Sequence, residues 1–139
     1  SGVTTQFPAL VAAITDASGE LTGVHRTWLN PDGCGKAMVE SPRRAMGQLL
    51  GSGVRFGAKS DQPIMVMAAG EGLETMLSLR MVLSPLPMIA GLSAGHLGAL
   101  VLPDRLQRLY LRRLGQSALS EAVACQLLPE DRARLVSSR

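Results

Sequence analysis

Aromatic residues are scarce in this chain, with one Trp, one Tyr and two Phe among 139 residues. Hydrophobic residues nevertheless make up 46% of the sequence, so a core must be built from Leu, Val, Ala, Met and Ile. Because a chain of this length can bury a sizeable core, the composition indicates one globular domain or one domain with an added edge.

Cysteine is also scarce, and its placement excludes the usual cysteine-dependent folds. Cys34 and Cys125 lie far apart, and no Cys-x-x-Cys or Cys/His spacing typical of zinc ligands is present. We therefore expect two reduced thiols, no zinc site and a cytoplasmic location.

Long apolar runs are missing as well. The most apolar stretch, residues 81–92, is interrupted by Pro85 and Pro87 and is shorter than the roughly 18 residues that a membrane helix needs. No signal peptide is visible. The sequence therefore predicts no membrane partner.

Lysine is rare, so the positive charge comes from arginine: twelve Arg against two Lys, with a net charge of +3. A charge this small does not by itself indicate nucleic-acid binding. It does permit a local basic face.

The first forty residues have the pattern of an antiparallel meander. Residues 9–15, 21–29 and 36–40 have strand-like composition, and the segments 16–20 and 30–35 between them are rich in turn residues. We expect three short antiparallel strands.

The next segment is ambiguous between helix and strand. Ser41 as an N-cap and Pro42 at the first helical position favour a helix beginning at residue 41. Four glycines then disfavour a long helix, namely Gly47, Gly51, Gly53 and Gly57. Residues 53–58 are typical of a short strand.

The second half alternates between strand and helix patterns. Strands are predicted at 63–69, 87–92 and 107–113, helices at 73–83 and 116–128, and a loop with a weak short helix at 93–103. This order predicts a parallel sheet with right-handed crossovers. The expected fold class is α/β, with a parallel sheet flanked by helices over residues 61–139 and an antiparallel β extension over residues 1–60.

Gly70, Glu71 and Gly72 follow the first buried strand of this half and precede a helix. In open α/β sheets ligands bind at this edge. A structural glycine-rich turn is one interpretation. A dinucleotide loop is another, although Thr75 stands at its third glycine position and no acid ends the next strand. The third is a metal-dependent site for phosphoryl transfer.

The third interpretation comes from resemblance. The strand followed by EGLET and an apolar helix resembles the first motif of the Toprim domain of bacterial-type primases and topoisomerases. FPALVAAITDASGELTGVHRTWLNPDGCGKA resembles the β extension that precedes this domain in primase/helicase proteins of phages, plasmids and integrated elements. MIAGLSAGHLGALVLPDRLQRLYL resembles the middle of the same family. Order and spacing over about a hundred residues carry the match, which implies a Toprim-like fold.

The resemblance also implies functional residues. Glu71 corresponds to the general acid/base or metal-facing acid, and Gly72 to the glycine after it. The family's Asp-x-Asp, which holds Mg²⁺, falls here near Leu114 and Gln116, which cannot be anionic ligands. Glu74 lies one turn from Glu71 and is a second candidate ligand, or simply part of a solvated helix face. Mg²⁺ binding is therefore expected to be weak or absent.

Basic residues suggest contacts with DNA or RNA. Lys36, Arg43 and Arg44 form one set, with Arg26 on a neighbouring strand; a solvated basic surface is the alternative. Trp28 either packs on one face of the extension or provides a stacking surface for bases.

A second basic pair, Arg112 and Arg113, follows the strand at 107–113. This pair can contact phosphates or pair with Glu71 in place of a metal, and solubilising charge is the alternative interpretation.

Together these features predict a degenerate Toprim-like module of a DNA primase/helicase-type replication protein, acting in nucleic-acid binding or as a scaffold. Its expected partners are DNA or RNA and other replication proteins or domains. The alternative is an active Mg²⁺-dependent phosphoryl- or nucleotidyl-transfer domain that uses Glu71.

Overall fold

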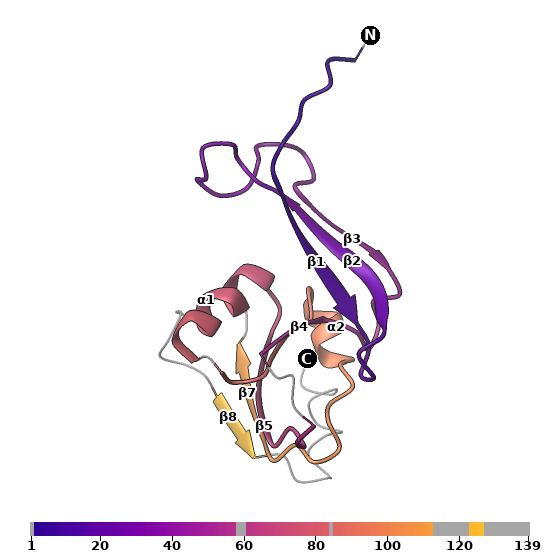
Figure 1. Ribbon diagram of the computed structural model, residues 1–139, viewed down its shortest axis with the longest axis vertical. Helices are drawn as coiled ribbons and strands as arrows, with labels where there is room; N and C mark the ends of the chain where they lie inside the picture. The colour runs from indigo at the N-terminus through magenta and orange to yellow at the C-terminus, as the bar shows by residue number, and fades with distance from the viewer. Residues whose placement is uncertain (1, 58–60, 84, 113–122, 127–139) are drawn as a thin grey trace.

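The computed structural model describes residues 2–57, 61–83, 85–112 and 123–126, which form two sheets and two helices (Figure 1). The elements are β1 (Ala9–Thr15), β2 (Leu21–Trp28), β3 (Arg43–Gly47), β4 (Val54–Phe56), β5 (Val66–Gly70), α1 (Leu73–Leu83), β6 (Met88–Ala90), α2 (Ala94–Gly98), β7 (Arg108–Arg112) and β8 (Val123–Gln126). The mixed α/β class is confirmed, as is an antiparallel β extension at the N-terminus.

The N-terminal sheet has the order β1-β2-β3, and each pair is antiparallel. Its first turn forms as the sequence predicts. Gly19 takes a positive φ of 89°, and the Asp16 carboxylate accepts hydrogen bonds from the backbone N–H groups of Ser18 (2.9 Å) and Glu20 (3.0 Å). These bonds fix the reversal between β1 and β2.

Alternation along the strands gives this sheet two different faces. The inner face is buried and carries Leu10, Ala12, Ile14, His25, Thr27 and Ala45. The outer face carries Val11, Val24, Arg26, Trp28, Arg44 and Met46. Val11 and Met46 are each 64% exposed, so this face is open to solvent although several of its side chains are apolar.

The third strand of the meander lies later in the chain than predicted. Residues 36–40 form no strand; Lys36 makes only an isolated bridge to Leu29. The helix predicted from residue 41 is also wrong, because β3 occupies that segment. Local capping signals favoured a helix, but this segment pairs with the free edge of β2 as an antiparallel strand.

The second sheet has the order β4-β6-β5-β7-β8. Its three central strands are parallel, as expected, whereas β4 pairs antiparallel with β6 and β8 antiparallel with β7. The sheet is therefore mixed, and the prediction of a wholly parallel sheet is wrong at both edges. The antiparallel strands cover edges that would otherwise be open.

The helix predicted over 116–128 is wrong for Val123–Gln126, which form β8. Pairing with β7 satisfies the backbone of this segment in an extended conformation. The remainder of that predicted helix lies outside the described residues.

Two apolar clusters sandwich the five-stranded sheet. On one face Ala68 and Met88 pack with Met76 of α1 and with Ile14 from the inner face of the N-terminal sheet. On the other face Ala69, Ile89 and Leu109 form a buried cluster against which Leu97 of α2 packs. One core thus joins the N-terminal sheet to the rest of the fold.

Polar bonds reinforce this joint. Thr15 and Gly53 exchange two backbone hydrogen bonds of 3.0 and 3.1 Å, and the Arg55 guanidinium donates to the Thr15 carbonyl oxygen. Arg55 lies in β4, which precedes the domain boundary predicted at residue 60 yet pairs within the five-stranded sheet. The N-terminal sheet and the five-stranded sheet are therefore joined by hydrogen bonds beside β4 as well as by a common core.

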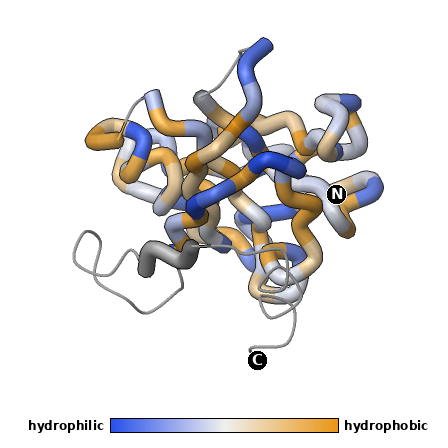
Figure 2. The backbone as a smooth tube through the Cα atoms, turned by 90° about the horizontal axis from the view of Figure 1, so that it is seen from below, coloured by the Kyte–Doolittle hydropathy of each residue, from blue (hydrophilic) through white to orange (hydrophobic). Residues whose placement is uncertain are grey.

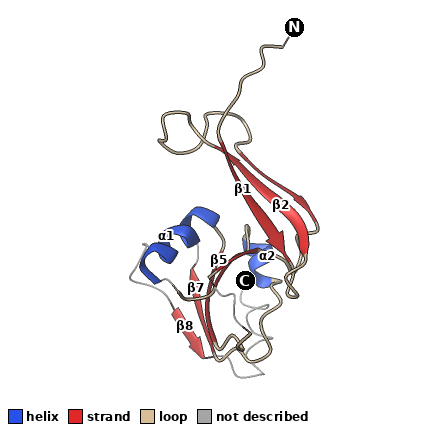
Figure 3. Cartoon of the chain, in the orientation of Figure 1, coloured by secondary structure: helices blue, strands red, loops and turns tan. Residues whose placement is uncertain are grey.

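The described chain contains more strand than helix. Helices are few, and strands dominate the described chain (Figure 3). Apolar and polar segments are interleaved along the backbone (Figure 2). Within the described residues, no helix is long and apolar enough to cross a membrane.

Candidate functional site

The Gly-Glu-Gly corner lies at the carboxyl edge of the parallel strands. β5 ends at Gly70, which is in register with Ala90 of β6 and with Arg112 of β7. The carbonyl oxygens of Gly70 and Glu71 each accept a 2.8 Å hydrogen bond from the backbone N–H groups of Gly91 and Leu92. The corner is thus tied by its backbone to the loop after β6.

The glycines of this corner are explained by packing. A Cβ built on Gly70 would lie 2.5 Å from the Sδ atom of Met76 and 3.1 Å from Cβ of Arg112. A Cβ on Gly72 would lie 3.2 Å from Oγ1 of Thr75. Neither glycine takes a positive φ. The close approach that they permit in this structure is that of α1 and β7 to the strand end.

The described part of the corner lacks a set of three or more metal ligands. Glu71 is half-buried, and no group of three or more Cys, His, Asp or Glu residues suited to a metal occurs in the described part of the chain. The positions of Leu114 and Gln116, where the family's Asp-x-Asp would fall, lie outside the described residues, as does Arg113. Arg112 does lie at this edge, beside Gly70.

Glu74, the second candidate metal ligand, forms an ion pair with Lys36. Its Oε1 atom lies 3.6 Å from Nζ of Lys36, with both side chains about two-fifths exposed. The structure thus links a predicted metal ligand to a predicted nucleic-acid contact. A half-exposed ion pair of this kind contributes roughly 0.2–1 kcal/mol to stability.

His25 lies near this ion pair, on the inner face of the sheet. It is 6% exposed, and its Nδ1 atom has no hydrogen-bond partner among the described residues. Burial lowers the pKa of His25, the negative charge of Glu74 opposes that shift, and the charges of Arg43, Arg26 and Lys36 add to it. His25 is therefore neutral at neutral pH and acts here as a core residue.

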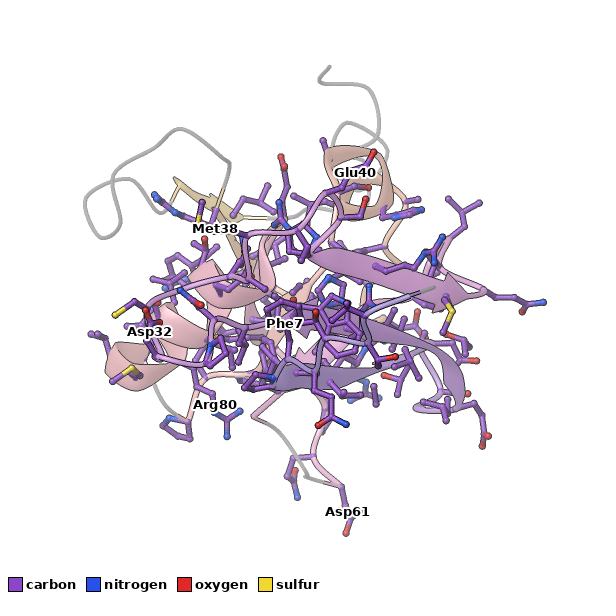
Figure 4. All side chains as sticks on the ribbon, turned by 90° about the horizontal axis from the view of Figure 1, so that it is seen from above. Phe7, Asp32, Met38, Glu40, Asp61 and Arg80 are labelled. Carbon is purple, nitrogen blue, oxygen red and sulfur yellow. The ribbon has the colours of Figure 1, made fainter. Side chains whose placement is uncertain are left out.

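A groove of about 710 Å³ lies on the N-terminal part of the molecule. Three segments line it: the chain before β1, the ends of β2 and β3 on the outer face, and the loop between them. Its lining residues are Thr5, Gln6, Phe7, Arg26, Trp28, Val39, Glu40, Ser41 and Arg44. Phe7 and Glu40, both labelled in Figure 4, belong to separate segments of the chain, one before β1 and one before β3.

Arg26 and Trp28 form a stacked pair within this groove. They are two residues apart on β2, so both point to the outer face. The Arg26 guanidinium carbon lies 4.2 Å from the centroid of the Trp28 ring, which is a cation–π contact. We call this pair the Arg26–Trp28 platform.

A second cation stands beside this platform. Arg44 of β3 is the direct cross-strand partner of Arg26, so two guanidinium groups project from neighbouring positions on one face. Like charges placed opposite each other across a sheet repel. The Nε atom of Arg26 is also buried without a hydrogen-bond partner among the described residues. The pair is well suited to an anion.

The structure separates residues that the sequence grouped together. Of Lys36, Arg43 and Arg44, only Arg44 lines the groove. Arg43 is in register with Thr27 on the opposite face, and Lys36 pairs with Glu74.

Neither Phe7 nor Glu40 belongs to a sequence motif that indicates a site. The Arg-x-Trp spacing on a predicted strand was an available signal for the platform, because residues two apart share a face. No local pattern pointed to the three segments that meet in the groove.

Comparison with known proteins gives one finding. A family model described as a domain of unknown function, DUF7146, matches residues 1–56. The match spans β1 to β4 and includes every residue that lines the groove. No curated protein and no solved structure matches the chain. The chain is thus similar to the DUF7146 family over its N-terminal segment, the segment that forms the groove.

Proposed function

We propose that the chain is a nucleic-acid-binding module, a degenerate Toprim-like domain of a primase/helicase-type replication protein, and that it binds nucleic acid in the groove of its N-terminal sheet. The observation that carries the proposal is the placement of Arg26, Arg44 and Trp28 together in one open groove. Guanidinium groups bind phosphates, and aromatic rings stack on bases.

The Toprim-like assignment rests on the sequence resemblance and is compatible with the central parallel strands. Strands β6, β5 and β7 run parallel, and Glu71 follows the carboxyl end of β5. The alternative, Mg²⁺-dependent phosphoryl transfer using Glu71, needs further anionic ligands around that acid. The groove supports binding directly, so binding is the function that we favour.

Arg44→Ala and Arg43→Ala make a matched test of the proposal. The two residues are adjacent on β3, both are exposed, and each substitution removes one positive charge. Only Arg44 lines the groove. We expect Arg44→Ala to weaken nucleic-acid binding about tenfold, the order expected for one charge-assisted hydrogen bond, and Arg43→Ala to change it little.

Fluorescence anisotropy of labelled DNA and RNA at several salt concentrations measures both affinity and the number of phosphate contacts. Losing Arg44 removes one phosphate contact. The negative slope of log affinity against log salt concentration should therefore become shallower by about 0.7 to 0.9. Equal losses for both variants would indicate a general charge effect and contradict the groove as the site. Failure of the wild-type chain to bind any nucleic acid would refute the proposed function.

A further inference from the structure

We infer that the groove takes single-stranded nucleic acid, with a phosphate between Arg26 and Arg44 and the neighbouring base stacked on the Arg26–Trp28 platform. This inference rests on the proposed function and specifies its ligand class. It depends on three features: the cross-strand arginine pair, the position of the platform inside the groove, and the apolar outer face beside it.

The arginine pair accounts for the phosphate. Arg26 and Arg44 occupy directly opposed positions on β2 and β3, and no acidic residue stands between them in the register of the three strands. The cross-strand neighbour of Arg26 on the other side is Val11. An anion that bridges the two guanidinium groups would remove their mutual repulsion and accept charge-assisted hydrogen bonds from both.

The platform accounts for the base. A base stacks on aromatic rings and on guanidinium planes, and here the two kinds of surface lie together. Trp28 is half-buried and forms part of the groove wall, with Phe7 lining the same groove. In a duplex the base faces are already covered by neighbouring bases, so a ring in this position can stack only on an unpaired base.

The size of the groove agrees with this ligand. Its volume of about 710 Å³ lies within the roughly 300–1,000 Å³ typical of sites for small organic ligands. One nucleotide of a strand therefore fits the groove, and its neighbours continue over the outer face. Val11 and Met46, each 64% exposed, give that face apolar contacts for further bases.

Glu40 limits the site to one principal phosphate position. Glu40 is one of the residues that line the groove, and its negative charge repels a second phosphate placed near it. Base edges with amino groups can instead donate a hydrogen bond to this carboxylate. The ligand is therefore oriented, with its phosphate toward the arginine pair and its base edge toward Glu40.

Trp28 is the only tryptophan of the chain, so its fluorescence reports directly on the platform. The experiment titrates the wild-type chain with single-stranded DNA, single-stranded RNA of the same sequence, and the corresponding DNA duplex, while anisotropy of a labelled strand measures binding. We expect saturable quenching of Trp28 by single strands and at least tenfold weaker binding of the duplex. Comparing DNA with RNA shows whether the 2′-hydroxyl affects affinity.

Two substitutions sharpen the result. Trp28→Leu should weaken single-strand binding about fivefold to a hundredfold, the range found for base stacking, whereas Trp28→Phe should retain most of it. If Trp28→Leu fails to fold, the Phe variant and the wild-type quenching still test the inference.

The possible outcomes separate this inference from the function on which it rests. Equal binding of duplex and single strand without quenching of Trp28 would overturn the inference and leave nucleic-acid binding intact. Absence of binding by every probe would overturn both.

Discussion

The groove on the N-terminal sheet and the Gly-Glu-Gly corner differ in what their side chains are free to do. In the groove, two arginines and an aromatic ring from neighbouring strands face an open space. In the corner, the absence of a side chain on Gly70 lets Met76 and Arg112 pack against the backbone. Two backbone carbonyl oxygens there accept hydrogen bonds from the loop after β6. The corner resembles a Toprim motif in sequence alone, and these contacts explain its glycines by packing.

A sequence motif and an open groove lined by cationic and aromatic side chains lie at different places in this chain. Glu71 has no described cluster of acids around it, and Glu74 pairs with Lys36. The groove has no short sequence signature, but it collects the groups that bind phosphates and bases.

The largest effect is expected for Met76→Ala, which tests whether the two regions fold as one unit. Met76 is fully buried between α1, the five-stranded sheet and the inner face of the N-terminal sheet. Its truncation should lower the free energy of unfolding by about 2–5 kcal/mol. Because Trp28 lies in the N-terminal sheet, its fluorescence should report the same shifted transition as far-UV circular dichroism.

Met81→Ala is the matched control, since Met81 lies on the same helix and is 87% exposed. We expect this change to stay within about 0.5 kcal/mol of wild type. If Met76→Ala left the midpoint of the Trp28 fluorescence transition unchanged, the N-terminal sheet would fold independently of the rest. The independent unit would then be close to residues 1–56, which the family model matches.

A smaller effect is expected from pH, through His25 at the junction of the two regions. Burial lowers the pKa of His25 below its usual 6.5. Below that pH the unfolded chain takes up a proton that the folded chain does not, so stability falls as pH drops, by at most about 1.4 kcal/mol per pH unit. Urea unfolding between about pH 7 and about pH 5.5 measures this loss.

His25→Gln should remove this part of the pH dependence. Asp16 does not interfere, because its hydrogen bond from Ser18 lowers its pKa below 3.8, outside this window. An unchanged pH dependence in the His25 variant would assign the effect to other groups.

The smallest effect is expected from replacing a Glu by Gln, a change that can be made both in the groove and at the Gly-Glu-Gly corner. Glu40→Gln removes a negative charge from the groove and should strengthen binding of single-stranded DNA about threefold. Glu71→Gln removes the same charge at the corner and should leave affinity unchanged. Fluorescence anisotropy measures the affinity of each variant for single-stranded DNA. A larger change for Glu71→Gln than for Glu40→Gln would place the ligand at the corner.

Much of the fold could be predicted from local pattern. The strands predicted at 9–15 and 21–29, the continuous apolar strand predicted at 63–69 and the helix predicted at 73–83 all occur in the structure, with shifts of a few residues at the strand ends. The failures lie where pairing overrides local preference. Ser41 and Pro42 favoured a helix, but that segment pairs with the edge of β2 as β3. Residues 123–126 were also predicted to be helical, and they pair with β7 as β8.

The site was predictable only in part. Arg44 was identified, but Arg43 was grouped with it because the segment was expected to be helical, whereas adjacent residues of a strand point to opposite faces. Phe7 and Glu40 reach the groove from segments distant from β3, and only the tertiary fold brings them there.

The most direct test of the account is a map of amide NMR shifts during titration with a short single-stranded oligonucleotide, followed by a second titration with Mg²⁺. The account predicts saturable shifts centred on Phe7, Arg26, Trp28 and Arg44, with little change at Gly70, Glu71 and Gly72. Shifts centred on the corner, enhanced by Mg²⁺ and lost in Glu71→Gln, would contradict it and support the metal-dependent alternative.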